Sequence, residues 1–287
     1  MGQEVVVKFV LFIAIALVAT LLALVWLQRG DRRAVAALRE SLSSLADTEA
    51  PRFRPAMVAD LPEPARRYLT WAIMPGTRLA RVAEIEMRGS FGLGDADDPK
   101  YQPMTARQVL ALPGGFVWEM RTTGGLPISG SDAGGAALSW TRFAIAGLIP
   151  VARAGWTEDH RRSAFGRAVA EAAIWTPAAV LPRPGVRWEA PSPDVARVTV
   201  EAEGLVQSVD LTLSPEGAPL SFVLQRWSNA NPAKVWQLQP FGGPLSDHRL
   251  VSGYRIPFHN EAGNFFGEEG YFPFFVADLT SVRYLPD

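Results

Sequence analysis

Four residues spaced evenly along one predicted helix are the first candidates for chemistry. Ser163, Arg167, Glu171 and Trp175 follow one another at intervals of four in the segment TEDHRRSAFGRAVAEAAIWTPAAVLP. Residues four apart lie on the same side of an α-helix. If that side faces a cleft, the guanidinium can hold an anionic head group while the carboxylate orients it. The alternative is a helix ion pair that also satisfies groups of a neighbouring strand.

Aromatic residues suggest what else such a cleft would contain. The chain has nine Trp, five Tyr and 15 Phe, many of them near the end in GNFFGEEGYFPFFVADL. They either fill the core of a sheet or line an apolar cavity that a single helix leaves open, the usual setting for a hydrophobic ligand. Arg226 and Trp227, in the segment PLSFVLQRW, complete the predicted ligand-binding set.

Other motifs of catalysis and cofactor binding are missing from the sequence. His160, His248 and His259 share no metal-ligand spacing, and there is no cysteine. We therefore predict no metal and no cofactor, and we assign no catalytic residue. The glycine-rich GFVWEMRTTGGLPISGSDAGG lacks a phosphate-binding pattern and reads as two strand ends and a flexible loop. Loop capping is the favoured role for its polar residues, Ser129, Ser131 and Asp132.

An N-terminal apolar segment predicts a membrane anchor. Residues 9–27 carry no charge and are flanked by Lys8 and Arg29, and at 1.5 Å per residue they just cross a hydrocarbon core of about 30 Å. A cleaved signal peptide is the alternative, but the run is longer than usual and no cleavage motif follows it. Arginines after the span favour a cytoplasmic body. The layout of short tail, single span and large body is that of a signal anchor, so we expect an extracytoplasmic domain on the bacterial inner membrane.

Composition and breaks in the pattern divide the chain. The 287 residues are 48% hydrophobic with a net charge of −1, so the sequence predicts a globular body without a nucleic-acid partner. Residues 1–29 are the predicted anchor, and 30–60 are an amphipathic helix followed by a proline-containing linker. Residues 61–287 are a single predicted β-rich domain, which opens with a short helix at 60–73.

Hydrophobic alternation dominates after residue 80. In RVAEIEMRGSF the odd-numbered positions Ala83, Ile85 and Met87 are apolar, whereas the even-numbered positions carry charge. This period of two recurs in segments separated by turn residues, which predicts roughly ten antiparallel strands. The fold class is therefore mainly β (α+β), a curved antiparallel sheet or half-barrel.

One long helix interrupts these strands near residues 158–175. Thr157 is a plausible N-cap, and Pro177 interrupts the helix. Phe165 and Val169 lie in one stripe and Arg167 and Glu171 in another, so we expect both sides to be covered, with the sheet wrapped around the helix.

The chain resembles a family of bacterial, typically membrane-associated proteins known only as a domain of unknown function. The matching segments are LPEPARRYL, PMTARQVLALPGGFVWEMR, GLPISGSD, GLIPVARA, RRSAFGRAVAEAAIWTPAAVLP with GVRWEA, LQRW and GYRIPFHNEAGNFFG. The resemblance covers nearly all of residues 61–285 and implies no reaction, because the family has none established. The predicted architecture is also similar to the half-barrels of bacterial lipoprotein carriers.

Three functions follow as hypotheses. We expect a membrane-anchored module that binds a lipid-like or other hydrophobic ligand rather than an enzyme. One alternative is a hydrolase acting on a membrane-derived substrate through Glu171, Arg167 and a neighbouring Asp or His. The other is a structural partner of a membrane protein, docking through an exposed sheet edge.

Overall fold

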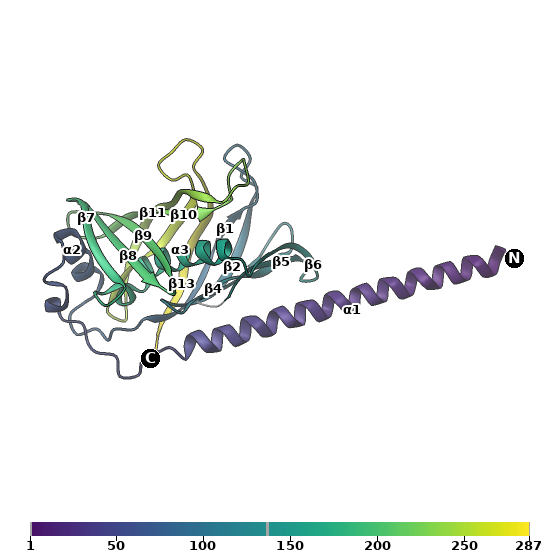
Figure 1. The fold of residues 1–287 in the computed structure, drawn as a ribbon, viewed down its shortest axis with the longest axis horizontal. Coiled ribbons are helices and arrows are strands. Elements are labelled where there is room, and N and C mark those ends of the chain that lie inside the picture. The colour runs from purple at the N-terminus through teal and green to yellow at the C-terminus, as the bar shows by residue number, and fades with distance from the viewer. Residues whose placement is uncertain (1, 136–137, 287) are drawn as a thin grey trace.

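The strands form one curved antiparallel sheet in the computed structural model (Figure 1). The structure describes residues 2–135 and 138–286, and within them the strand order is β6-β5-β4-β3-β2-β1-β13-β12-β11-β10-β9-β8-β7. Because β6 and β7 are opposite edges, the sheet is unclosed, which confirms the mainly β fold class. The strands are β1 (Val82–Gly92), β2 (Tyr101–Ala111), β3 (Gly115–Thr122), β4 (Ile128–Gly135), β5 (Ser139–Ile145), β6 (Ile149–Gly155), β7 (Val186–Ser192), β8 (Val195–Ala202), β9 (Leu205–Leu213), β10 (Pro219–Ser228), β11 (Gln237–Val251), β12 (Tyr254–Asn264) and β13 (Phe272–Leu285).

The helix α3 (Glu158–Trp175) carries the chain from one edge strand, β6, to the other, β7. It crosses the concave side of the sheet, as predicted (Figure 1). The Thr157 side chain caps it by accepting a hydrogen bond from the backbone N–H of His160, at 3.1 Å. The short 3-10 helix η2 (Pro177–Val180) follows.

Small residues let α3 approach the sheet closely. Ala164, Ala168 and Ala172 are all buried, and a Cβ atom on Gly134 of β4 would lie only 2.6 Å from the Ala164 Cβ. This explains why SGSDAGG, predicted as a loop, is a strand: its inward positions carry little apolar bulk because the helix occupies that space. The prediction of a flexible loop there was wrong.

One end of the concave side is closed by η1 (Pro55–Val58) and α2 (Glu63–Ala72). The buried hydroxyl of Tyr68 on α2 donates to the Ala173 carbonyl, and that of Tyr284 on β13 donates to the Trp175 carbonyl at 2.7 Å. The last carbonyls of a helix have no partner inside it, so these tyrosines satisfy the C-terminal end of α3.

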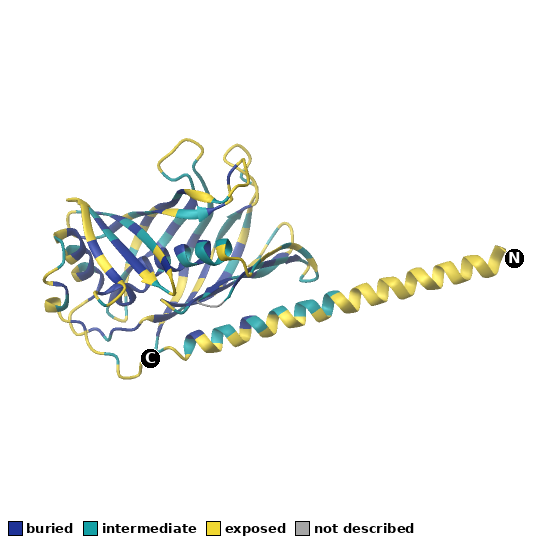
Figure 2. Cartoon of the chain, in the orientation of Figure 1, coloured by how far each residue is buried: buried dark blue, intermediate teal, exposed yellow. Residues whose placement is uncertain are grey.

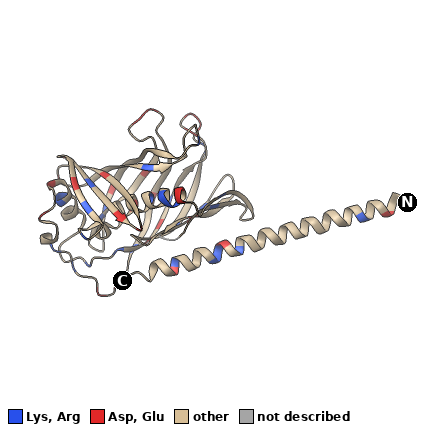
Figure 3. Ribbon diagram, viewed as in Figure 1, with Lys and Arg blue, Asp and Glu red and all other residues tan. Residues whose placement is uncertain are grey.

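The N-terminal helix α1 (Gly2–Ser43) continues past the predicted span without a break. Among the described residues it is the one helix long and apolar enough to cross a membrane. Its first part is exposed (Figure 2) and, between Lys8 and Arg29, free of charge (Figure 3). Its last part lies on the convex side of the sheet, where Val35 and Leu42 are buried in a second apolar cluster with Val82, Val109, Ala111, Val117, Ala133 and Trp140.

Ion pairs hold α1 against the convex side. The Asp31 carboxylate accepts from Arg142 Nη1 at 2.8 Å and from Arg153 Nη1 at 2.6 Å. Burial lowers the pKa of Arg142 although Asp31 raises it. Arg39 donates to Glu119 of β3 at 3.4 Å. The helix is thus tied to β3, β5 and β6.

We predict that Asp31→Asn lowers the free energy of unfolding by about 1–3 kcal/mol, because it leaves two close guanidinium groups without their shared carboxylate. Urea unfolding of the full chain in a neutral detergent, followed by tryptophan fluorescence, measures the change. Glu40→Gln, an exposed position on the same helix, is the control and should unfold like the wild type. Equal stability of all three proteins would contradict a structural role for Asp31.

Candidate functional site

A buried charge cluster lies where α3 faces β2 and β4. Arg167 donates from Nε to Glu171 Oε1 at 2.7 Å and from Nη1 to Asp132 Oδ2 at 2.6 Å. Gln108 of β2 completes it, since its Nε2 donates to Glu171 Oε2 at 2.6 Å and its Oε1 accepts from Arg167 at 3.3 Å. The side chains of Arg167, Asp132 and Glu171 are 15%, 17% and 13% exposed. Burial alone lowers the pKa of Arg167, but the two carboxylates outweigh it and the pKa is raised, so the guanidinium stays charged.

A hydrogen-bond chain leads from this cluster to the start of α3. Thr141 donates to Asp132 Oδ1 at 2.6 Å, and its hydroxyl also lies 3.0 Å from His160 Nε2. A hydroxyl has one proton to give, so Nε2 is the protonated nitrogen, and Nδ1 accepts from Ser139 at 2.8 Å. Burial lowers the pKa of His160, against the effect of Asp132 and together with that of Arg226. The neutral imidazole is therefore favoured.

A band of aromatic rings crosses the concave side next to this cluster. Trp118 is its centre, with ring centroids 6.2 Å from Phe143, 6.0 Å from Phe275 and 6.4 Å from Phe91. The band continues from Phe91 through three further rings to β10, with centroids 5.7 to 6.3 Å apart: Phe274, Phe241 and Phe222. The Arg167 guanidinium lies 5.1 Å from the Trp118 ring. Four members of the band are only half-buried, so α3 does not cover them fully: Phe91, Phe143, Phe274 and Phe275.

The guanidinium of Arg226, on β10, lies against this band, and its Nε makes no hydrogen bond with the described residues. Its guanidinium lies 4.8 Å from the Phe241 ring, and its buried Nε has no hydrogen-bond partner among the described residues. Burial, with the charge of Arg167, lowers the pKa of Arg226 to about 10, although Asp132 and Glu171 raise it. The buried Nε1 of Trp118 also has no partner in the described part of the chain. Buried donors are usually satisfied, which makes these two nitrogens exceptions among the buried donors of the described residues.

The predicted site residues fall into two groups. Arg167 and Glu171 are hydrogen-bonded, and both lie close enough to Arg226 for their charges to shift its pKa. Ser163 is buried one turn before Arg167. Trp175 lies at the other end of α3, beside Tyr284.

Trp227 points to the start of α3 instead, where Nε1 donates to Asp159 at 2.7 Å and the Arg162 guanidinium lies 4.1 Å from its ring. Two members of the cluster lie outside the predicted ligand-binding set: Asp132, for which loop capping was the favoured role, and Gln108. The sequence does mark Gln108 as unusual, because this polar residue occupies an inward strand position between the apolar residues Ala106 and Leu110.

The three histidines lie apart. His160 is in the first turn of α3, His248 packs edge-on against Trp71 with centroids 5.1 Å apart, and His259 bonds to Asp278 at 2.7 Å. Among the described residues no group of three or more His, Asp or Glu side chains is arranged to hold a metal ion.

Comparison with known proteins gives a family and one distant structure. A solved structure from Vibrio parahaemolyticus, described as an outer membrane lipoprotein-sorting protein domain, is similar at 8% identity and a TM-score of 0.37. It covers 81% of this chain and 92% of its own, and at that distance it carries no argument about function. No curated protein matches. A family model matches residues 51–277, from the segment before η1 into β13. The chain therefore belongs to this family, DUF6544, a family of unknown function.

Proposed function

We propose that the protein is a membrane-anchored binding module for a lipid-like ligand. The apolar chain of the ligand lies on the aromatic band, and its anionic or carbonyl head group accepts from Arg226. The observation that carries the proposal is the buried Nε of Arg226, which has no hydrogen-bond partner among the described residues. The Arg226 guanidinium lies over the buried ring of Phe241, in a band that also contains four half-buried rings. An acyl chain matches the rings, and a carboxylate or ester oxygen matches the donor.

The charge cluster favours binding over hydrolysis. Glu171 and Asp132 each accept from two groups, namely Arg167 with Gln108 and Arg167 with Thr141. Because Arg167 occupies both carboxylates, we assign them to the placement of α3 rather than to acid–base chemistry.

The span of α1 supports an anchor that stays in the mature protein. Residues 31–42 of the same helix are fixed to the convex side of the sheet, so the anchor and the domain share one continuous helix. We propose a single-pass protein of the bacterial inner membrane with its domain outside the cytoplasm.

Orientation is testable because the chain has no native cysteine. We expect Ser246→Cys, at an exposed position on β11, to react with a membrane-impermeant maleimide when the reagent reaches the extracytoplasmic side of intact cells. Lysed cells give the maximum labelling. Protection in intact cells together with full labelling after lysis would place the domain in the cytoplasm.

For the ligand site, we predict that Arg226→Gln lowers labelling by a photoactivatable palmitic acid about tenfold or more, since a charged hydrogen bond contributes roughly 1.5–3 kcal/mol. The full chain is labelled in nanodiscs, and the adducts are mapped by peptide mass spectrometry. They should fall on the strands of the aromatic band, β1, β3, β5, β10, β11 and β13.

Arg187→Gln, an exposed strand arginine on the convex side, is the matched control and should be labelled like the wild type. Labelling confined to residues 9–27, or unchanged by Arg226→Gln, would contradict the binding site.

For the charge cluster, we predict that Glu171→Ala lowers the free energy of unfolding by about 1–3 kcal/mol in the absence of any ligand, because Arg167 and Gln108 lose a buried partner. Thermal unfolding with and without palmitic acid measures both effects. Glu189→Ala, an exposed carboxylate, is the control. Unchanged stability of Glu171→Ala with weaker stabilisation by palmitic acid would instead make Glu171 a ligand-binding residue.

A further inference from the structure

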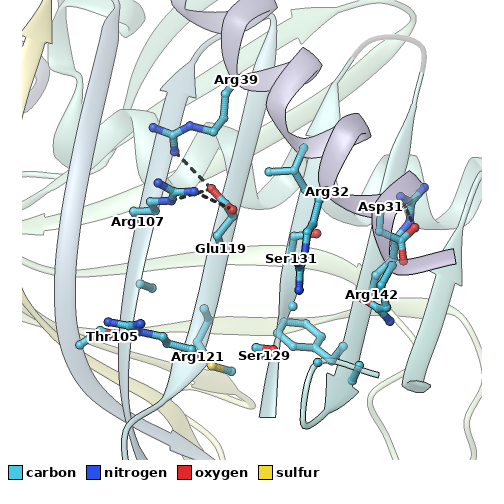
Figure 4. Close-up of a pocket in the computed structure, with 18 of the residues that line it drawn as sticks. Asp31, Arg32, Arg39, Thr105, Arg107, Glu119, Arg121, Ser129, Ser131 and Arg142 are labelled. Carbon is cyan, nitrogen blue, oxygen red and sulfur yellow. Dashed lines mark hydrogen bonds and ion pairs between the residues drawn. The ribbon is translucent and has the colours of Figure 1, made fainter. Parts of the chain in front are cut away.

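A groove of about 1040 Å³ separates α1 from the convex side of β1 to β6 (Figure 4). Seven arginines and three carboxylates are among the residues that line it, which gives an excess of four positive charges: Arg32, Arg39, Arg88, Arg107, Arg121, Arg142 and Arg153, with Asp31, Glu86 and Glu119. The groove is therefore strongly basic although the whole chain carries a charge of −1.

Four of these arginines form ion pairs with two carboxylates within the groove. Asp31 holds Arg142 and Arg153, and Glu119 accepts from Arg107 at 2.7 Å and from Arg39 at 3.4 Å. These pairs hold α1 and the strands together, so they are not the free charge of the groove.

The other three arginines have no carboxylate partner among the described residues. Arg88 and Arg121 lie in one outward-facing row of the sheet, in which Arg88 pairs with Thr105, Thr105 with Arg121 and Arg121 with Ser129. Within residues 2–135 and 138–286, the one polar contact of these arginines is from Arg121 Nε to Thr105 Oγ1, at 3.3 Å. Asp278, opposite Arg88 on β13, binds His259 instead.

Arg32 brings a third guanidinium to this row from α1. Its Nη2 and the Ser129 Oγ both lie within about 4 Å of the position that a Cβ atom on Gly147 would occupy. Three guanidinium groups and two hydroxyls thus line one end of the groove across β1 to β4, with Arg32 and Ser129 next to the turn between β5 and β6. Several donors without an acceptor are what a phosphate group requires.

This end of the groove lies next to the predicted membrane surface. Arg32 is five residues after Leu27, the last residue of the apolar run, which is about 8 Å along a helix. Ile149 and Val151, 58% and 51% exposed, lie on the same edge strand, β6, as Arg153. Exposed apolar side chains beside arginines are typical of a surface that rests on lipid head groups.

We propose that this end of the groove binds the phosphate of an anionic phospholipid head group through Arg32, Arg88 and Arg121, with Thr105 and Ser129 as further donors. The lipid fixes how the domain sits on the membrane. The proposal depends on α1 as a membrane span and is independent of the ligand proposed for the concave side.

The test is native mass spectrometry of the full chain in a neutral detergent, titrated with phosphatidylglycerol. We expect saturable binding by the wild type, and binding weaker by about tenfold or more in the triple variant Arg32→Gln, Arg88→Gln, Arg121→Gln, since each arginine near an anionic lipid contributes. A second variant, Ser129→Asp, places a carboxylate among the three arginines. It should weaken binding equally without lowering the urea midpoint, so lost binding cannot be attributed to unfolding.

The control is the triple variant Arg33→Gln, Arg54→Gln, Arg187→Gln, which removes the same charge at exposed positions outside the groove. It should bind phosphatidylglycerol like the wild type. Binding that survives the groove substitutions, or that falls equally in the control, overturns the site. Calorimetry with inorganic phosphate is the second arm: if free phosphate binds as tightly as the lipid, the groove serves a soluble anion and the lipid assignment is overturned.

Discussion

The guanidinium of Arg167 is charged and buried, and the inner side of the sheet is arranged around it. Its partners come from three elements: Asp132 on β4, Glu171 on α3 itself, and Gln108 on β2. A buried charge that loses one partner costs several kcal/mol, more than the pair contributes by itself. These contacts therefore fix both the rotation of α3 about its axis and its height above the sheet, while the alanines beneath it only permit the close approach.

The order of the strands explains why α3 lies on the concave side of the sheet. The chain finishes one meander at β6 and begins the next at β7, and these strands are the two far edges of the sheet. A connection around the outside would meet α1 on the convex side, whereas the concave side needs apolar filling. The helix is covered all round, with buried residues on every side. A single helix does not cover the whole concavity, since Phe91, Phe143, Phe274 and Phe275 of the aromatic band stay half-buried.

Alternation in the sequence predicted the sheet and the helix because burial on one side of a strand leaves a direct trace in residue type, as at Ala83, Ile85 and Met87. The site was only partly predictable, for two physical reasons. Asp132 lies on a strand whose inward positions carry little apolar bulk, so no alternation marks it. Trp175 was grouped with Ser163 by intervals of four, but twelve residues are about three and a third turns, so the two side chains point roughly 120° apart.

The two faces of the sheet are linked through the same strands. On β4, Ser131 faces α1 and its neighbour Asp132 faces α3; on β5, Arg142 pairs with Asp31 outside while Thr141 bonds Asp132 inside. Successive residues of a strand point to opposite sides, so a slip of one residue exchanges the two sets. Such a slip on β5 would put the Arg142 guanidinium under α3 and take the partner of Asp31 away. A one-residue slip of a strand would break the ion pairs on both sides of the sheet. The pairs on the α3 side and those on the α1 side therefore favour the same strand register, which fixes the inner site and the outer groove together.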